Sequence, residues 1–134
     1  MKPASNDPCP CGRTAPGGRP LTFSACCGPY VTGSEPAPDA EALMRSRYTA
    51  FVMEDADYLL ATWHAGTRPL SVTFEPGLKW LGLEVREHRV VDATHAEVEF
   101  VARSRAAGRG HRLHERSRFV CEDGRWFYID GVIR

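Results

Sequence analysis

Four cysteines near the N-terminus constrain the fold of this chain more than any other feature. They form a Cys9-Pro10-Cys11 knuckle and a Cys26-Cys27 pair, and the tract between the two is rich in Pro and Gly. Such a tract has too few apolar side chains to build a hydrophobic core, whereas four thiolates can surround one tetrahedral ion. We therefore predict a zinc site whose ligands are Cys9, Cys11, Cys26 and Cys27.

Two other uses of these cysteines stay open at this point, namely redox or disulfide chemistry and cysteines without a shared role. Disulfides need an oxidising compartment, and residues 1–7 contain no apolar segment of the kind that exports a chain. We therefore expect a cytoplasmic, reduced protein.

Composition limits the classes of partner. The formal net charge is zero, so the chain lacks the basic excess that is typical of general nucleic-acid binders. No segment approaches the roughly 20 apolar residues of a membrane span. We expect neither nucleic acid nor a membrane as a partner.

The two cysteine segments resemble the SEC-C motif, a small zinc-binding module found at the tail of the translocase ATPase SecA and in many bacterial proteins. The resemblance rests on the stretches Asp7-Pro8-Cys9-Pro10-Cys11-Gly12 and Cys26-Cys27-Gly28. The gap between them is longer than is usual in the motif, and Cys27 stands where the motif often has His. The resemblance implies zinc as cofactor. It also implies docking on a protein partner, of the kind associated with ribosomes or export chaperones.

The chain is expected to divide into three parts. Residues 1–32 form the cysteine-rich module, residues 33–38 form a linker stiffened by two prolines, and residues 39–134 form a compact domain. We expect this domain to have a core of its own that contains none of the four cysteines.

Two helices are predicted at the start of the domain. Asp39 is a plausible N-cap for a helix that runs to about residue 53, with an apolar stripe at three- and four-residue spacing. Asp55 can cap a second helix, which carries Trp63 on its inner face and ends at residues 65–66.

Residues after Leu78 alternate between apolar and polar side chains, which predicts four strands. Asp123-Gly124 is a strong hairpin signal, and weaker turn signals lie at residues 92–94 and 108–109. The predicted fold class is therefore α+β, with two helices packed in a curved four-stranded antiparallel sheet.

The Asp123-Gly124 hairpin also predicts which residues pair across the last two strands. The expected pairs are Cys121 with Trp126, Phe119 with Tyr128, Ser117 with Asp130, and Glu115 with Val132. A loop at residues 108–109 would add the pairs Phe100 with Ser117, Ala102 with Glu115, and, on the outer face, Glu99 with Arg118.

On this register the inner face is apolar except for Glu115, Ser117 and Asp130, and we expect Arg45 to be the first partner of the two carboxylates. One interpretation is a closed polar network that fixes how helices and sheet dock. The other is a pocket in which an acid and an imidazole bind a small molecule or exchange a proton. Its predicted lining is Arg45, Tyr48, Trp63, His64, Glu115, Ser117, Trp126, Tyr128 and Asp130.

Several segments of the domain resemble the YchJ-like bacterial family. They are Leu43-Met44-Arg45-Ser46-Arg47-Tyr48, Trp63-His64, His114-Glu115-Arg116-Ser117-Arg118-Phe119 and Asp123-Gly124-Arg125-Trp126-Phe127-Tyr128-Ile129-Asp130-Gly131. The resemblance implies a nuclear-transport-factor-2-like fold, which is a cone of helices in a bent sheet. The mouth of that cone holds an active site in some relatives and is filled by side chains in others.

The outer face of the sheet offers two further surfaces. One is basic, a solvated face or a site for an acidic protein or RNA. The other is an apolar strip on the last strand, which the cysteine-rich module or a second subunit of a homodimer would cover. Their predicted residues are Arg103, Arg105, Arg109, Arg112, His114 and Arg116 for the basic surface, and Phe127, Ile129 and Ile133 for the strip.

Two functional hypotheses follow from these patterns. The favoured one is an interaction protein that docks through its zinc module. The alternative is a small-molecule-binding or catalytic cone with Glu115, Asp130 and His64 at its site. The sequence contains no nucleophile with an adjacent base and no Gly-rich phosphate loop, so no reaction is assigned.

Overall fold

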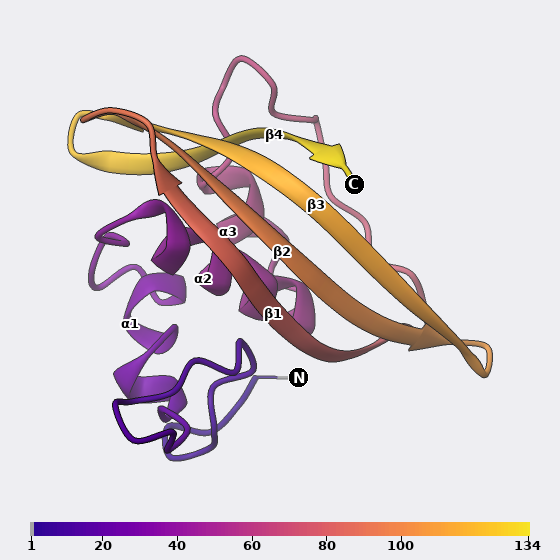
Figure 1. Ribbon diagram of the computed structural model, residues 1–134. Helices are drawn as coiled ribbons and strands as arrows, with labels where there is room; N and C mark the ends of the chain where they lie inside the picture. The colour runs from indigo at the N-terminus through magenta and orange to yellow at the C-terminus, as the bar shows by residue number, and fades with distance from the viewer. Residues whose placement is uncertain (1) are drawn as a thin grey trace.

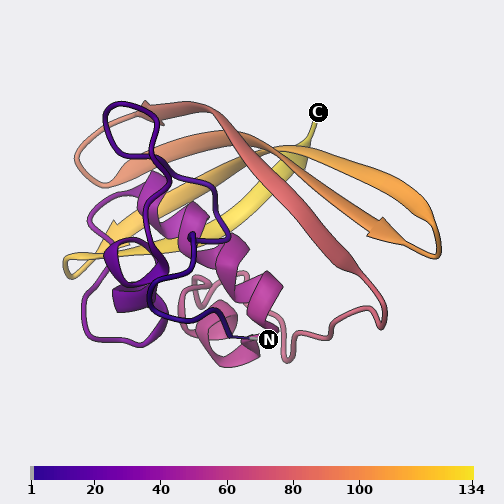
Figure 2. The ribbon, with the colours of Figure 1, turned by 90° about the horizontal axis from the view of Figure 1, so that it is seen from below.

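A curved antiparallel sheet covers the helices of this protein (Figure 1). The computed structural model describes residues 2–134. The sheet has the order β1-β2-β3-β4, and its strands are β1 (Lys79–Val90), β2 (His95–Ala106), β3 (Arg109–Glu122) and β4 (Arg125–Ile133). Seen from below, the longest helix lies under the sheet with the N-terminal loops beside it (Figure 2). The predicted α+β arrangement is confirmed.

Both predicted helix caps are confirmed. The carboxylate of Asp39 accepts a hydrogen bond of 2.7 Å from the backbone N–H of Ala42 at the start of α2 (Ala40–Met53). The carboxylate of Asp55 accepts one of 3.1 Å from Tyr58 at the start of α3 (Ala56–Ala61). These side chains satisfy backbone donors that the first turn of a helix leaves free. Two shorter elements precede α2 in the chain. They are a 3₁₀ turn, η1 (Phe23–Ala25), and the helix α1 (Gly28–Val31).

Helix α3 is shorter than predicted, and Trp63 lies beyond its end. The backbone N–H of Tyr128 donates to the carbonyl of Thr62 at 2.8 Å, and the N–H of His64 donates to the carbonyl of Tyr128 at 2.8 Å. Trp63 thus forms a parallel bridge with Tyr128 of β4. The helix ends early because residues 62–64 pair with the edge of the sheet.

The β3–β4 hairpin has the predicted turn and half of the predicted register. Asp123 and Gly124 both have positive φ, 53° and 79°, as a type I′ turn requires. The pairs Cys121 with Trp126 and Phe119 with Tyr128 are confirmed, but the register then shifts at a bulge beside Phe119. The pairs beyond it are therefore Arg118 with Asp130, Ser117 with Gly131, and Glu115 with Ile133, and the two predicted pairs there are wrong.

The bulge has a cause outside the hairpin. The extra residue is Ile129, whose carbonyl accepts a hydrogen bond of 2.6 Å from the Thr67 hydroxyl. This loop contact engages the backbone of β4 from its open edge. The residues after Ile129 consequently change faces, so that Asp130 lies on the outer face and Ile133 on the inner side, where it stays 65% exposed.

The β2–β3 turn lies one residue earlier than predicted. Ala107 and Gly108 are its central residues, with φ of 52° and 76°, because this turn type favours Gly at its second position. The register moves by two residues, which keeps every side chain on its predicted face. The corrected pairs are Phe100 with Glu115, Ala102 with Leu113, and Glu99 with Arg116.

The hydrophobic core is continuous from the cysteine-rich module into the sheet. Cys11 and Cys27, at 0% and 1% exposure, belong to the same buried cluster as Leu43 of α2 and Phe119 of β3. The expectation of a core without the cysteines is therefore wrong. Ala37, in the predicted linker, is buried in this cluster as well.

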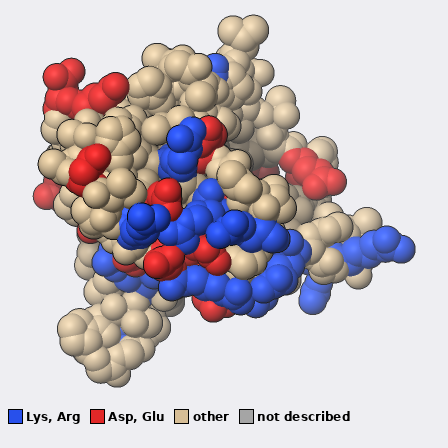
Figure 3. Space-filling model, turned by 45° about the horizontal axis from the view of Figure 1, so that its top comes forward, with Lys and Arg blue, Asp and Glu red and all other residues tan. Residues whose placement is uncertain are grey.

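The outer face of the sheet carries bands of Lys and Arg with carboxylates between them (Figure 3). Arg116 donates to Glu87 at 2.6 Å, Glu97 at 2.8 Å and Glu99 at 3.0 Å, which links three strands. Of the apolar strip, Phe127 is half-buried with its ring centroid 6.4 Å from that of His64.

No helix within residues 2–134 is long and apolar enough to cross a membrane.

Candidate functional site

The four predicted ligands form one buried cluster. Their sulfur atoms all lie within 4.8 Å of one another, and all four cysteines are free. The Sγ atoms of Cys11 and Cys26 are 3.5 Å apart, and those of Cys26 and Cys27 are 4.0 Å apart. This donor set suits a tetrahedral, thiolate-preferring metal ion.

Local backbone hydrogen bonds bring the two cysteine pairs together. The N–H of Cys9 donates to the carbonyl of Leu21 at 2.9 Å, and that of Gly12 donates to the carbonyl of Cys9 at 3.0 Å. Gly12 has φ of 76°, a conformation that glycine adopts at little cost. On the other side, the carbonyl of Cys27 accepts from the first turn of α1. The knuckle and the helix start therefore face each other.

The four thiols of the cluster perturb one another's pKa values. The neighbouring thiols of Cys11, Cys26 and Cys27 lower the pKa of the Cys9 thiol, while the thiols of Cys11 and Cys26 raise the pKa of Cys27. One thiolate is thus stabilised at the expense of its neighbours. A metal ion at the centre would deprotonate all four thiols together.

Helix α2 supports this cluster from the side. The hydroxyl of Thr49 lies 3.8 Å from the sulfur of Cys9. The guanidinium of Arg45 donates to the carbonyl of Cys11 at 3.1 Å and to Glu41 at 2.9 Å. The prediction that Arg45 partners Glu115 is therefore wrong. Positions two apart on a helix differ by about 200° in direction, so Arg47, not Arg45, faces the sheet.

A second site is a cavity of about 230 Å³ between α2 and the sheet, which we call the cone pocket. Five residues of the predicted lining are among its walls, namely Tyr48, Trp63, Glu115, Ser117 and Tyr128. The remaining walls are Met44, Arg47, Phe51, Trp80, Phe100, Ala102 and Leu113.

Arg47 is the charged group of the cone pocket that the sequence-based lining omits. It is 5% exposed, and its Nη1 donates to the carbonyl of Leu59 at 2.8 Å and to the hydroxyl of Thr62 at 2.7 Å. The guanidinium carbon lies 5.0 Å from the ring centroid of Trp63 and 4.6 Å from that of Tyr128. Burial lowers the pKa of Arg47 to about 10, so it is charged at neutral pH. The sequence did contain an indication that Arg47 is buried, because this residue falls within the apolar stripe of α2.

Glu115 faces the cone pocket and has hydroxyl partners. Its carboxylate accepts hydrogen bonds of 2.6 Å from Ser117 and 3.2 Å from Tyr128. Burial raises the pKa of Tyr128, which keeps this hydroxyl protonated. On β4, a Cβ at Gly131 would overlap the carboxylate, so the glycine leaves room for it.

Three other residues of the predicted lining lie elsewhere, besides Arg45. Asp130 is on the outer face because of the β4 bulge, and it accepts two hydrogen bonds of 2.7 Å from Arg118. His64 follows the early end of α3 and pairs with Glu122 at 3.1 Å. Trp126 is on the inner side but lines a different hollow, next to Tyr58. The predicted acid–imidazole pair is therefore absent from the described part of this pocket.

Comparisons with known proteins agree with this architecture. The family model described as the YchJ middle NTF2-like domain matches residues 39–131. A UPF0225 protein of Polaromonas naphthalenivorans is 68% identical over 130 residues, which cover 92% of this chain and 96% of that protein. A UPF0225 protein of Bordetella parapertussis is 53% identical and covers 98% of this chain and 97% of its own length.

Two solved structures share the fold across both the cysteine cluster and the cone. The solution structure of a SEC-C motif containing protein from Rhodopseudomonas palustris has a TM-score of 0.79 at 33% identity, covering 94% of this chain and 98% of that chain. The crystal structure of a SEC-C motif containing protein from Psychrobacter arcticus has a TM-score of 0.79 at 30% identity, covering 97% and 84%.

Proposed function

The chain belongs to the YchJ family, and from this premise we propose that it is a metal-stabilised binding protein whose cone pocket holds a small, largely apolar molecule through a carbonyl-type oxygen. The observation that carries this proposal is Arg47, a buried cation in the wall of a cavity. No carboxylate forms an ion pair with it anywhere in residues 2–134.

A buried charge is costly unless hydrogen bonds satisfy it. Nη1 of Arg47 has two acceptors, whereas Nε and Nη2 make no hydrogen bond to a described residue and are not fully buried, so water or a ligand can reach them. An oxygen atom of a ligand in the cone pocket would supply the missing acceptor. The oxygen of a carboxylate or of an amide fits this requirement, because both accept from guanidinium N–H groups.

The walls around Arg47 define the rest of the ligand. Most are apolar or aromatic, such as Met44, Phe51, Phe100 and Trp80. The volume of about 230 Å³ lies below the roughly 300–1,000 Å³ of sites for drug-sized ligands. A single substituted ring or a short acyl chain therefore matches the space.

Benzoate, benzamide and toluene provide a direct test, because they share a ring and differ in the acceptor. Binding is measured by NMR shifts of Ser117 and Tyr128. We expect at least one of the two oxygen-bearing probes to bind more tightly than toluene, and Arg47→Met to abolish that preference.

A pocket-filling variant controls for misfolding, because Arg47 also bonds the backbone of α3. Ala102→Leu leaves Arg47 intact and should abolish binding of every probe. Toluene binding as tightly as both of the others, or Ala102→Leu binding like the wild type, would contradict the proposal.

Zinc is the metal that we propose for the cysteine cluster. A tetrahedral ion with Zn–S bonds of about 2.3 Å places its sulfurs about 3.8 Å apart, and the spacings of 3.5 Å and 4.0 Å lie on either side of that value. Protein purified under reducing conditions without chelator should contain about one equivalent of zinc. Cys26→Ser should remove it, and Cys121→Ser should not. A metal-free wild type with four rapidly alkylated thiols would contradict this assignment.

Docking through the cysteine-rich module is a second candidate, favoured by an exposed turn at residues 16–20 that a Thr14–Pro20 bridge closes. A ribosome- or export-chaperone-associated protein is the proposed partner class. The test is a pull-down with Arg19→Glu, since removing the whole module would open the core. Equal recovery by the variant and the wild type would contradict docking through this turn.

A further inference from the structure

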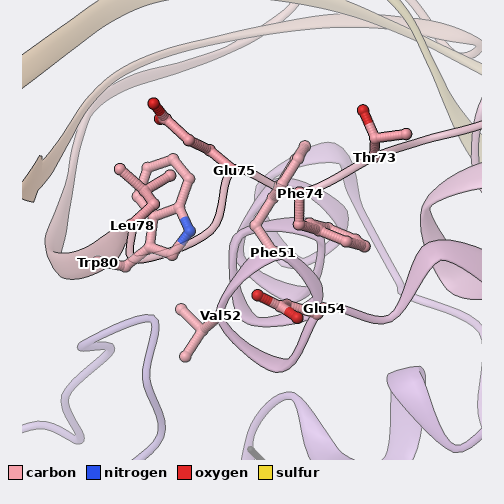
Figure 4. A pocket seen from close by; sticks show the side chains of 8 residues that line it. All are labelled: Phe51, Val52, Glu54, Thr73, Phe74, Glu75, Leu78 and Trp80. Carbon is pink, nitrogen blue, oxygen red and sulfur yellow. The ribbon is translucent and has the colours of Figure 1, made fainter. Parts of the chain in front are cut away.

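We propose that another hollow, at the C-terminal end of α2, binds an organic ammonium group. It has a volume of about 230 Å³ and is lined by Phe51, Val52, Glu54, Thr73, Phe74, Glu75, Leu78 and Trp80. Figure 4 shows these side chains, which come from α2, from Glu54 just after it, from the segment before β1 and from β1 itself. The hollow shares Phe51 and Trp80 with the cone pocket but is otherwise distinct.

Three aromatic rings form the walls of this hollow. The ring centroids of Phe51 and Phe74 are 6.2 Å apart with an interplanar angle of 80°, and those of Phe51 and Trp80 are 5.9 Å apart at 53°. All three side chains are half-buried. Rings set at steep angles present π faces in several directions, and a cation over such a face is attracted by the ring quadrupole.

Two carboxylates accompany the rings and have no cation of the protein beside them. Within residues 2–134, neither Glu54 nor Glu75 forms an ion pair or a side-chain hydrogen bond, although most carboxylates of the sheet do. Figure 4 draws the Glu54 carboxylate below Phe51, and the Glu75 carboxylate beyond Trp80, pointing away from Phe51 and Phe74. The rim of the hollow therefore carries exposed negative charge beside its aromatic walls, which is the chemistry that recognises alkylammonium ions.

Glu54 occupies a position that local backbone preference would give to another residue. It follows the last turn of α2 with φ of 57° and ψ of 45°, in the left-handed region where helix ends favour glycine. Backbone preference therefore does not account for a glutamate here. Its side chain instead supplies a negative charge to the hollow.

An organic cation fits better than a metal ion. Ca²⁺ and Mg²⁺ need six or more oxygen ligands at about 2.0–2.6 Å, whereas this hollow offers two carboxylates, one threonine hydroxyl and apolar walls. A trimethylammonium group has a positive charge that is spread over three apolar methyl groups. It can contact rings and leave the carboxylates partly hydrated.

The experiment compares choline with its uncharged carbon isostere, 3,3-dimethylbutan-1-ol, on the full-length protein. Binding is followed through the indole N–H signal of Trp80 in NMR titrations. We expect choline to bind at least about fivefold more tightly than the isostere, because the charge interacts with rings and carboxylates. Equal affinity of the two compounds, or no shift of Trp80 with either, would overturn the proposal.

Two variants make the test specific to the site. Glu54→Gly removes a carboxylate and restores the residue that the left-handed conformation favours, so choline binding should fall severalfold while the melting temperature does not fall. Asp57→Asn removes an exposed negative charge from α3 and should leave binding unchanged. Unchanged choline binding in Glu54→Gly would count against the site. Ala102→Leu should also bind choline normally, which separates this result from the cone pocket.

Discussion

Gly131 is the residue on which the position of Glu115 depends. A Cβ at this position would overlap the Glu115 carboxylate, whereas the backbone of Gly131 itself is not strained. We expect Gly131→Ala to push Glu115 away from Ser117 and Tyr128 and to lower the free energy of unfolding by about 1–3 kcal/mol. Urea denaturation measures this loss. In a Glu115→Ala background the same change should cost almost nothing, and an unchanged cost there would contradict the steric explanation.

Glu115 itself should contribute modestly to stability, because its partners are hydroxyls and not a cation. Glu115→Ala leaves the buried hydroxyl of Ser117, which is 1% exposed, without its acceptor. We expect a loss of about 1–2 kcal/mol. Removing the partner of a buried ion pair typically costs about 3–5 kcal/mol, so a loss in that range would point to a cation next to Glu115.

The ion pair between Arg118 and Asp130 ties β3 to β4 across the outer face. The two hydrogen bonds from Arg118 lower the pKa of Asp130. A lowered folded-state pKa means that the pair contributes fully above the unfolded-state value of about 3.9 and is lost as the pH falls through the lower folded-state value. Both side chains are about half exposed, so the effect is small.

The measurement is urea stability as a function of pH for the wild type and Arg118→Gln. We expect the wild type to be more stable at pH 7 and the difference to shrink as the pH falls below the unfolded-state value of about 3.9, because protonation of Asp130 removes the pair. A difference that persists unchanged at low pH would show that Arg118 stabilises the sheet by packing alone.

The features that could be predicted from the sequence and those that could not differ in how distant in the chain their determining contacts are. The caps at Asp39 and Asp55 and the turn at Asp123 were predictable, because each depends on residues within a few positions. The β4 bulge was not, because it depends on a contact between Thr67 and Ile129 that is distant in sequence. That one extra residue moved Asp130 to the outer face, although the alternating pattern placed it inside.

The cysteine cluster is part of the same folded core as the cone. Thr49 and Arg45 reach it from α2, the helix whose opposite side carries Arg47 into the cone pocket. The prediction that the four cysteines form one cluster is confirmed, because it depends on the spacing within a local motif. The sequence did not reveal that their sulfurs pack within the same core as Leu43 and Phe119.

The shared core predicts that metal removal unfolds the whole chain. Structural zinc contributes about 10 kcal/mol or more in small zinc modules, and a domain is stable by only about 5–15 kcal/mol. We expect a strong chelator, or Cys27→Ser, to abolish the near-ultraviolet circular dichroism of the sheet-bound tryptophans together with metal content, in one transition. Cys121→Ser should keep both. If the tryptophan signals survived complete loss of the metal, the cone would be shown to fold without the cluster, and the metal would then act on the N-terminal module alone.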